Sequence, residues 1–134
     1  MNSWVFEITT GKMYRPDGSL CGTGYAGGDL GKVSDAVDNP VYESVHDVGP
    51  LPEGWYTFQS ARNSPALGPL AIPLDPDPEN IMYGRLDFYC HGDIANKFES
   101  ASEGCIIMSE DVRREMEASP VRRIQVVAAV RPKT

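Results

Sequence analysis

The sequence has no long hydrophobic run and no recognisable export signal. Its best apolar stretch, residues 124–130, is far shorter than the roughly 20 residues that a membrane-spanning helix needs. Residues 1–4 lack the basic start and the apolar stretch of a signal peptide. We therefore expect a soluble chain that is synthesised in the cytoplasm, with any export by a route that this sequence does not show.

Positive charge is also scarce. Twelve Lys and Arg side chains stand against 19 Asp and Glu, which gives a net charge of −7. A groove for a phosphate backbone needs clustered Lys and Arg, and the sequence contains no such cluster. Nucleic acid and anionic membrane surfaces are therefore poor candidates for partners.

Cysteine is the third scarcity. The chain has three cysteines, Cys21, Cys90 and Cys105. An odd number does not make a disulfide framework, and no CxxC pair predicts a zinc site. At least one thiol is expected to be free.

What is present indicates one globular domain over residues 1–134. The chain is 41% hydrophobic and 23% charged, ordinary values for a folded domain of this length. Thirteen Gly and 11 Pro favour a turn-rich, mostly β architecture.

The pattern along the chain predicts six or seven strands and a single helix. The helix begins after Ser109, which suits an N-cap, and ends near Ser119-Pro120. Residues 26–53 have no clear period, and a loop of that length in a small domain is usually functional or mobile. The segments expected to be extended are 4–8, 12–14, 20–25, 55–59, 86–90 and 123–130, and 67–74 is a candidate for a seventh.

Alternation suggests where the chemistry lies. Every second residue from Leu86 to Cys90 is apolar, which predicts that Cys90 faces the core and that His91, at the strand end, lies on the wetter face. Cys105 follows Gly104, which allows a substrate to approach the backbone closely. A thiol needs a nearby base or cation to become a thiolate, and His91 is the better placed of two histidines. The spacing alone also fits a capping His91 and a buried, inert Cys105.

Two segments carry a resemblance to a known family. Residues 88–93 and 101–107, Phe-Tyr-Cys-His-Gly-Asp and Ala-Ser-Glu-Gly-Cys-Ile-Ile, resemble the active-site signature of L,D-transpeptidases: a His, a variable loop, then Ser/Thr-His-Gly-Cys. They are most similar to the Tlde1 branch of small type VI secretion effectors, where the segment before the Cys reads Ser-x-Gly-Cys. Residues 49–56 and 25–40 are similar to the family's Pro-Gly turn and opening loop, so the resemblance covers roughly residues 4–130.

The resemblance implies a fold and four site residues. The fold is a small, mainly β L,D-transpeptidase sandwich or barrel, with one helix after the nucleophile strand. Cys105 matches the nucleophile, His91 the general base, and Ser102 a hydroxyl that orients the imidazole. The backbone N–H groups of Gly104 and Cys105 would form an oxyanion hole. No metal or organic cofactor is required.

The sequence departs from the broader family at two positions. Glu103 replaces a second His, and Ile107 stands where that family usually has an Arg. Arg85 or Lys97 is a candidate to bind a substrate carboxylate in its place.

Two further residues are candidates for substrate contact. Tyr89 shares the expected wetter face of the strand with the candidate base. Asp93 could hold the imidazole tautomer, although an Asp at a strand end is as often a plain turn residue.

The implied activity is acyl transfer on peptidoglycan tetrapeptide stems. Water as the acceptor makes an L,D-carboxypeptidase, and an amine makes a transpeptidase. Implied partners are the stems, a cognate immunity protein and secretion machinery, and the place of action is the periplasm, including that of a target cell. Three alternatives stay open: another cysteine peptidase or amidase, a non-catalytic wall-binding or phage-derived module, and a His/Cys/Asp zinc site.

Overall fold

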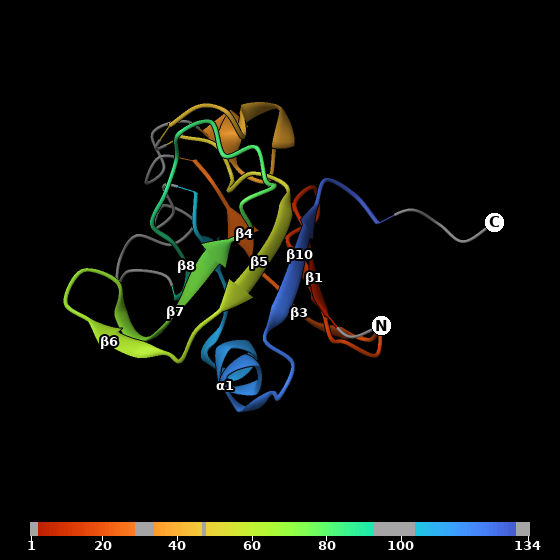
Figure 1. Cartoon of the computed structure of the whole chain (residues 1–134), viewed down its shortest axis with the longest axis vertical. Helices are drawn as coiled ribbons and strands as arrows, with labels where there is room; N and C mark the ends of the chain where they lie inside the picture. Colours follow the sequence, from red (N-terminus) through yellow and green to blue (C-terminus); the bar gives the residue numbers. More distant parts are fainter. Residues whose placement is uncertain (1–2, 29–33, 47, 93–103, 131–134) are drawn as a thin grey trace.

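The strands of this protein join into one mixed sheet. The structure is a computed structural model that describes residues 3–28, 34–46, 48–92 and 104–130. Within these residues ten strands pair in the order β3-β2-β1-β10-β5-β7-β8-β9-β4, with β6 attached to β7 (Figure 1). The β1–β10 and β8–β9 pairs are parallel, and the other pairs are antiparallel. The mainly β class predicted from the sequence is confirmed, and the part of the chain that the structure describes contains one α-helix.

The elements have the following bounds: β1 Trp4–Glu7, β2 Lys12–Tyr14, β3 Leu20–Thr23, β4 Tyr25–Ala26, η1 Ser34–Ala36, η2 Pro40–Tyr42, β5 Gly54–Phe58, β6 Arg62–Ser64, β7 Gly68–Pro76, β8 Phe88–His91, β9 Ile106–Ile107, α1 Glu110–Ala118 and β10 Arg123–Val127.

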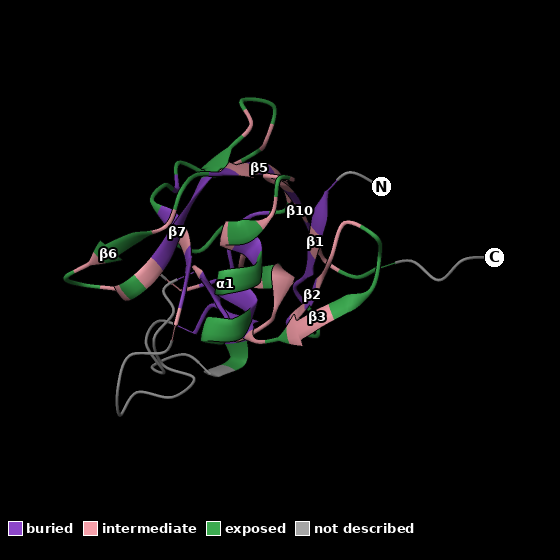
Figure 2. Ribbon diagram, turned by 90° about the horizontal axis from the view of Figure 1, so that it is seen from below, coloured by how far each residue is buried: buried purple, intermediate pink, exposed green. Residues whose placement is uncertain are grey.

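The sheet curls until its two ends meet. β3 and β4 are the outermost strands in the pairing order, yet only Gly24 separates them in the sequence. A Cβ atom at Gly24 would lie 1.8 Å from the Ile107 carbonyl oxygen, so only glycine allows the chain to cross so close to β9. Seen from below, the strands form an arc around α1, which covers one open end of the curled sheet (Figure 2).

The core lies on the inner face of this curl. Alternate residues of neighbouring strands bury their side chains there, as period-2 alternation requires. The registered core pairs are Trp4 with Ile124, Phe6 with Val126, Ile124 with Tyr56, Phe58 with Leu74, Leu74 with Phe88, Ile72 with Cys90, and Cys90 with Ile106.

The helix closes the core from below. The Ser109 hydroxyl accepts a hydrogen bond from the Val112 N–H and caps α1, and Val112 and Met116 face the core. The Met116 sulfur lies 4.0 Å from the Cys90 sulfur. The predicted start and end of the helix are confirmed.

Two expectations about the strands need correction, and one strand was not expected. Segment 20–25 is two strands on opposite ends of the sheet, β3 and β4, rather than one. Segment 62–64 forms β6, an exposed polar edge strand whose sequence has no apolar alternation. Leu86 is 69% exposed and not buried as expected. Asp87 has a positive φ of 66°, so the extended backbone of β8 begins only after it, and the alternation does not reach Leu86.

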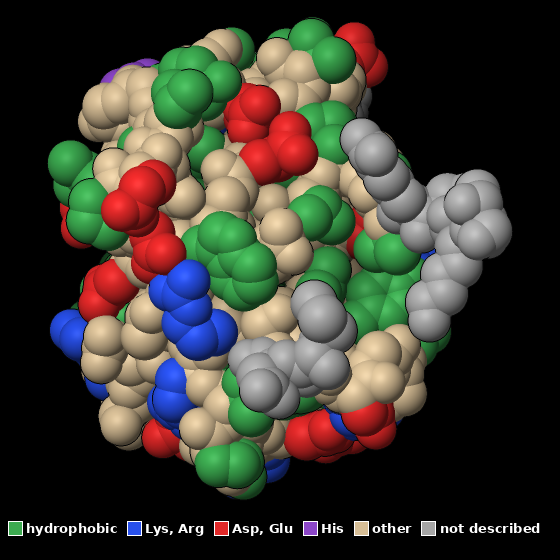
Figure 3. Space-filling view, turned by 45° about the vertical axis from the view of Figure 1, so that its right-hand side comes forward, with side chains coloured by type: hydrophobic (Ala, Val, Ile, Leu, Met, Phe, Trp, Pro, Cys, Tyr) green, Lys and Arg blue, Asp and Glu red, His purple; other side chains and the backbone are tan. Residues whose placement is uncertain are grey.

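The loop predicted over residues 26–53 contains two short 3₁₀ helices, η1 and η2, in the part that the structure describes. No helix in the described residues is long and apolar enough to cross a membrane. On the face in Figure 3, Lys and Arg side chains occupy a small area with Asp and Glu side chains beside them.

Candidate active site

Two parallel strands bring the candidate nucleophile and base to one face of the sheet. In β8 and β9, Cys90 is registered with Ile106 and His91 with Ile107. Cys105 directly precedes β9, so alternation places its side chain on the same face as His91 and opposite to the core. The prediction from alternation that Cys90 lies in the core is confirmed, since this residue is fully buried.

The Cys105 sulfur sits against the backbone at the start of β8. The Tyr89 N–H donates a hydrogen bond to Sγ at 3.4 Å, and the Asp87 carbonyl oxygen lies 4.0 Å from Sγ. The N–H can stabilise a negative charge on the sulfur, whereas the Asp87 carbonyl oxygen accepts a hydrogen bond from the protonated thiol. Tyr89 therefore contributes through its backbone, a role that sequence reasoning missed.

The imidazole of His91 is held in one tautomer. Its Nδ1 lies 2.8 Å from the Gly92 carbonyl oxygen, which can only accept, so Nδ1 carries the proton. The Nε2 atom of the neutral ring is then the one that can take a proton from a thiol. The prediction that His91 lies on a solvent-exposed face is wrong, because the residue is only 1% exposed. Its ring forms part of the wall of a cavity.

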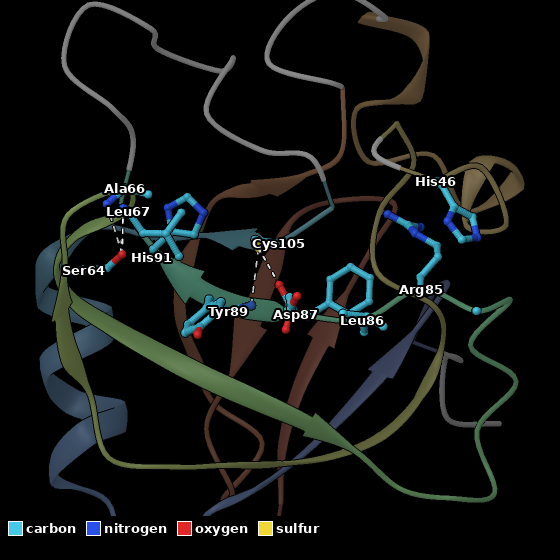
Figure 4. Close-up of a pocket in the computed structure, with 12 residues that line it drawn as sticks. His46, Ser64, Ala66, Leu67, Arg85, Leu86, Asp87, Tyr89, His91 and Cys105 are labelled. Atoms are coloured by element: carbon cyan, nitrogen blue, oxygen red, sulfur yellow. Dashed lines mark hydrogen bonds between the residues drawn. The ribbon is translucent and has the colours of Figure 1, made fainter.

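Cys105 and His91 line the same cavity of about 650 Å³, a size that suits a small ligand or a short peptide. In Figure 4, His91 lies on one side of Cys105, toward the β6–β7 hairpin, and Arg85 and His46 lie on the other. The residues that line this cavity are His46, Ser64, Ala66, Leu67, Gly84, Arg85, Leu86, Asp87, Phe88, Tyr89, His91 and Cys105.

The Arg85 guanidinium is tied to the loop beside the cavity. Its Nη1 donates to the Glu43 and Pro50 carbonyls, both at 2.7 Å, and its Nη2 to the Gly49 carbonyl at 2.8 Å. The guanidinium also stacks over Phe88 at 5.0 Å from the ring centre. Arg85 thus joins Glu43 to Gly49 and Pro50, and its predicted binding of a substrate carboxylate stays a prediction.

Gly104 is required by the backbone. Its φ is +129°, and a Cβ there would lie 2.4 Å from Arg85 Nη2 and 3.0 Å from the Gly49 carbonyl oxygen. Its own carbonyl accepts from the Leu51 N–H at 2.9 Å. These contacts of the protein fix the peptide that precedes Cys105, and the predicted approach of a substrate at Gly104 stays a prediction.

Four residues named in the sequence analysis lie outside the described residues. They are Ser102, the candidate hydroxyl, Asp93, the candidate tautomer-holding group, and Lys97 and Glu103. Their predicted roles stay predictions.

The other two thiols differ from Cys105 in their surroundings. Complete burial raises the pKa of Cys90 to about 12. Partial burial, together with the neighbouring Glu115 carboxylate, raises the pKa of Cys21, whose thiol donates to that carboxylate at 3.5 Å. Cys21 packs on the edge of the core, as expected of a residue without a catalytic role.

Sequence reasoning missed the cavity wall formed by β6 and the turn after it. Ser64 Oγ accepts from the N–H groups of Ala66 and Leu67 and shapes that turn. The Ser-Pro-Ala-Leu-Gly composition of 64–68 is a turn signal, although nothing in it points to the cavity. His46, the second histidine of the chain, is exposed, and its Nε2 lies within hydrogen-bond distance of the Tyr83 carbonyl oxygen.

No group of three His, Cys, Asp or Glu side chains in the described part of the chain is placed to hold a metal ion.

Among known families, the one described as the Tlde1 domain matches residues 30–131. No curated protein and no solved structure matches the chain.

Proposed function

The chain belongs to the Tlde1 family, a type VI effector-like family, and on this premise we propose that it is an L,D-carboxypeptidase or L,D-transpeptidase of peptidoglycan stem peptides. The observation that carries the proposal is that Cys105 and His91 line one cavity. The Gly92 carbonyl fixes the tautomer of His91, and the Tyr89 N–H supports the sulfur of Cys105.

The first half of the reaction forms a thioester. Nε2 of His91 takes the proton of the Cys105 thiol, and Sγ attacks the carbonyl carbon that precedes the terminal D-residue of a tetrapeptide stem. The N–H groups of Gly104 and Cys105 are the candidate donors to the oxyanion, a kind of contact worth about 3–4 kcal/mol in other enzymes. The C–N bond then breaks, and Nε2 gives its proton to the departing amine.

The second half releases the acyl group. Nε2 of His91 takes a proton from water or from an incoming amine, whose oxygen or nitrogen bonds to the carbonyl carbon while the S–C bond breaks. Water gives a tripeptide and hydrolysis, and an amine gives a cross-link. Cys105 is returned as the thiol, and no external oxidant or reductant takes part.

The membership also supports a biological setting. We propose an antibacterial effector that is delivered by secretion machinery, neutralised by a cognate immunity protein in its producer, and active in the periplasm of a target cell. The net charge of −7 disfavours binding to the phosphate backbone of a nucleic acid, so a substrate of another class is expected.

The test is product analysis on disaccharide-tetrapeptide muropeptides. Wild-type protein should convert tetrapeptide to tripeptide or to a cross-linked product, seen by mass. Cys105→Ala should abolish turnover with an unchanged circular dichroism spectrum, because it removes the nucleophile without adding volume. Ser102→Ala should cost less, because a residue that orients the base is less important than the nucleophile.

Cys21→Ala is the matched control and should retain turnover, since its thiol bonds to Glu115 on the helix. Tripeptide formation by Cys105→Ala would contradict the assignment of the nucleophile. Cleavage between sugar and peptide would instead identify an amidase.

A further inference from the structure

Arg85 is a buried cation in the wall of the candidate active site. It is 7% exposed, it lines the same cavity as Cys105, and its guanidinium stacks over Phe88 (Figure 4). A buried guanidinium needs hydrogen-bond partners that match its planar fork of donors. Backbone carbonyls of the loop before β5 supply such partners, so this side chain organises the main chain beside the cavity.

The hydrogen bonds of Arg85 bring this loop against Gly104. Nη1 of Arg85 donates to the Pro50 carbonyl, and Nη2 donates to the Gly49 carbonyl. A Cβ at Gly104 would lie 2.4 Å from Nη2 and 3.0 Å from the Gly49 carbonyl oxygen, so this hydrogen-bonded pair packs directly on Gly104. The next residue of the loop, Leu51, donates its N–H to the Gly104 carbonyl at 2.9 Å.

The hydrogen bond from Leu51 also sets the direction of the Cys105 N–H. The C=O and N–H of a trans peptide lie in one plane and point in opposite directions. Because the Gly104 carbonyl is directed at Leu51, the Cys105 N–H of the same peptide points away from the loop. This N–H is a candidate donor to the oxyanion, and such a donor works only when it is aimed at the position where the charge develops.

We propose that Arg85 is a positioning residue that aims the Cys105 N–H at the oxyanion, acting through the loop segment 49–51. The proposal rests on the function proposed above, because an oxyanion forms only when Cys105 attacks a carbonyl carbon. It gives Arg85 a role in the rate of acylation. This role differs from the carboxylate binding predicted from the sequence, and the experiment below separates the two.

The experiment compares two reactions of the Cys105 sulfur. In the reaction with p-nitrophenyl acetate, Sγ bonds to the carbonyl carbon, negative charge develops on the carbonyl oxygen, and the bond to p-nitrophenolate then breaks. Iodoacetamide alkylates the same sulfur by displacement of iodide from a CH₂ group, and no oxyanion forms. Acylation is followed by p-nitrophenolate release with the Cys105→Ala background subtracted, and alkylation by peptide mapping. The ratio of the two rates reports the oxyanion donor separately from the thiolate.

Arg85→Lys should lower the acylation rate by about 10- to 100-fold, the loss expected when an oxyanion donor is misplaced, and leave the alkylation rate unchanged. Lys keeps the positive charge but lacks the planar fork that holds neighbouring carbonyls. Arg122→Lys is the matched control. Arg122 also donates to backbone carbonyls, at the end of α1, and its guanidinium lies over Phe58 at 4.6 Å. It lies outside the lining of this cavity, so both rates should match wild type.

Two results would overturn the proposal. One is an unchanged acylation rate in Arg85→Lys, and the other is an equal loss in both reactions, which would mean that Arg85 acts on the thiol or on the whole fold. If Arg85→Lys does not fold, replacement of Leu51 by its α-hydroxy acid analogue tests the same link. This change removes the N–H that holds the Gly104 carbonyl and keeps the buried side chain. An unchanged ratio of the two rates there would also overturn the proposal.

Kinetics on the stem peptide distinguish positioning from carboxylate binding. With the tetrapeptide as substrate, Arg85→Lys should lower kcat and leave KM near the wild-type value, because the N–H acts on the transition state. A loss carried by KM, and absent for the same peptide with a C-terminal carboxamide, would assign Arg85 to the substrate carboxylate and overturn the proposal. If wild type turns over no stem peptide, the proposed function fails, and the ester and iodoacetamide reactions alone decide the role of Arg85.

Discussion

The three thiols of this chain occupy three different environments. Cys90 lies in the core between Ile72 and Ile106, Cys21 faces a carboxylate at the edge of the sheet, and Cys105 opens into a cavity. Among the contacts of the three thiols that the structure describes, only the Cys105 sulfur accepts a hydrogen bond from a backbone N–H. Reactivity should therefore follow position rather than residue type.

We predict that Cys105 is alkylated first by iodoacetamide between pH 6 and 8. The raised pKa values of Cys90 and Cys21 keep those thiols protonated in this range, and a protonated thiol is a poor nucleophile. His91→Ala should slow the reaction of Cys105 near neutrality. The measurement is peptide mapping of the modified protein against pH, and equal rates at all three cysteines would contradict the assignment.

At the scale of elements, one ion pair joins the centre of the sheet. Arg123 of β10 donates from Nη1 and Nη2 to the two carboxylate oxygens of Asp77, at 2.7 and 2.9 Å, just after β7 ends. Its guanidinium also lies over Trp55 of β5 at 5.0 Å. The Arg123 side chain thus connects β10 to β5 and to the residue that follows β7. The hydrogen bonds from Arg123 hold the pKa of Asp77 below its usual value.

This contact predicts a pH dependence of stability. A carboxyl whose pKa is lowered on folding adds stability above its unfolded pKa, about 3.9, and loses it as the pH falls through the folded value. Asp77→Asn should therefore reduce the free energy of unfolding at pH 7, and this loss should become smaller as the pH falls below the unfolded pKa of about 3.9. Urea unfolding at pH 7, 5, 3 and 2 measures the difference.

Asp75→Asn is the control for that series. Asp75 lies two residues earlier and accepts a hydrogen bond from the Gln59 amide instead of from an arginine. Its substitution should cost less free energy of unfolding at pH 7 than Asp77→Asn, because it breaks no ion pair. A loss of unfolding free energy in Asp77→Asn that is as large at pH 2 as at pH 7 would show that the ion pair is not its cause.

At the scale of the whole molecule, the curl of the sheet determines where the cavity lies. The contact between Gly24 and Ile107 closes the ends of the sheet beside β9, so the cavity forms beside the strands that carry His91 and Cys105. The substrate proposed for this site lies outside the cytoplasmic membrane of a bacterial cell. The effect of the protein on a cell should therefore depend on the compartment in which it is placed.

We predict that the protein is harmless when expressed in the cytoplasm and toxic when a heterologous signal sequence sends it to the periplasm. Removal of the terminal D-residue depletes the donors for cross-linking and should round or swell the cells. Muropeptide analysis by mass should show tripeptides in place of tetrapeptides only for exported wild type. Toxicity of the cytoplasmic form, or of exported Cys105→Ala, would favour a binding module over an enzyme.

The sequence by itself determined the features that depend on near neighbours in the chain. Alternation placed Cys90 in the core, Ser109 predicted the start of the helix, and the segments around His91 and Cys105 identified the family. These are interactions over two to four residues, or a motif that carries its own signature.

Only the tertiary structure decided what those residues contact. The burial of His91, the support of the Cys105 sulfur by a backbone N–H, and the hydrogen bonds from Arg85 to the loop before β5 all join segments that are distant in the sequence. A backbone donor has no side-chain identity to read, and an arginine in a loop carries no mark of whether it faces solvent or the carbonyls of another loop. These contacts exist because the sheet curls and α1 closes it, and the curl depends on the packing of all its strands together.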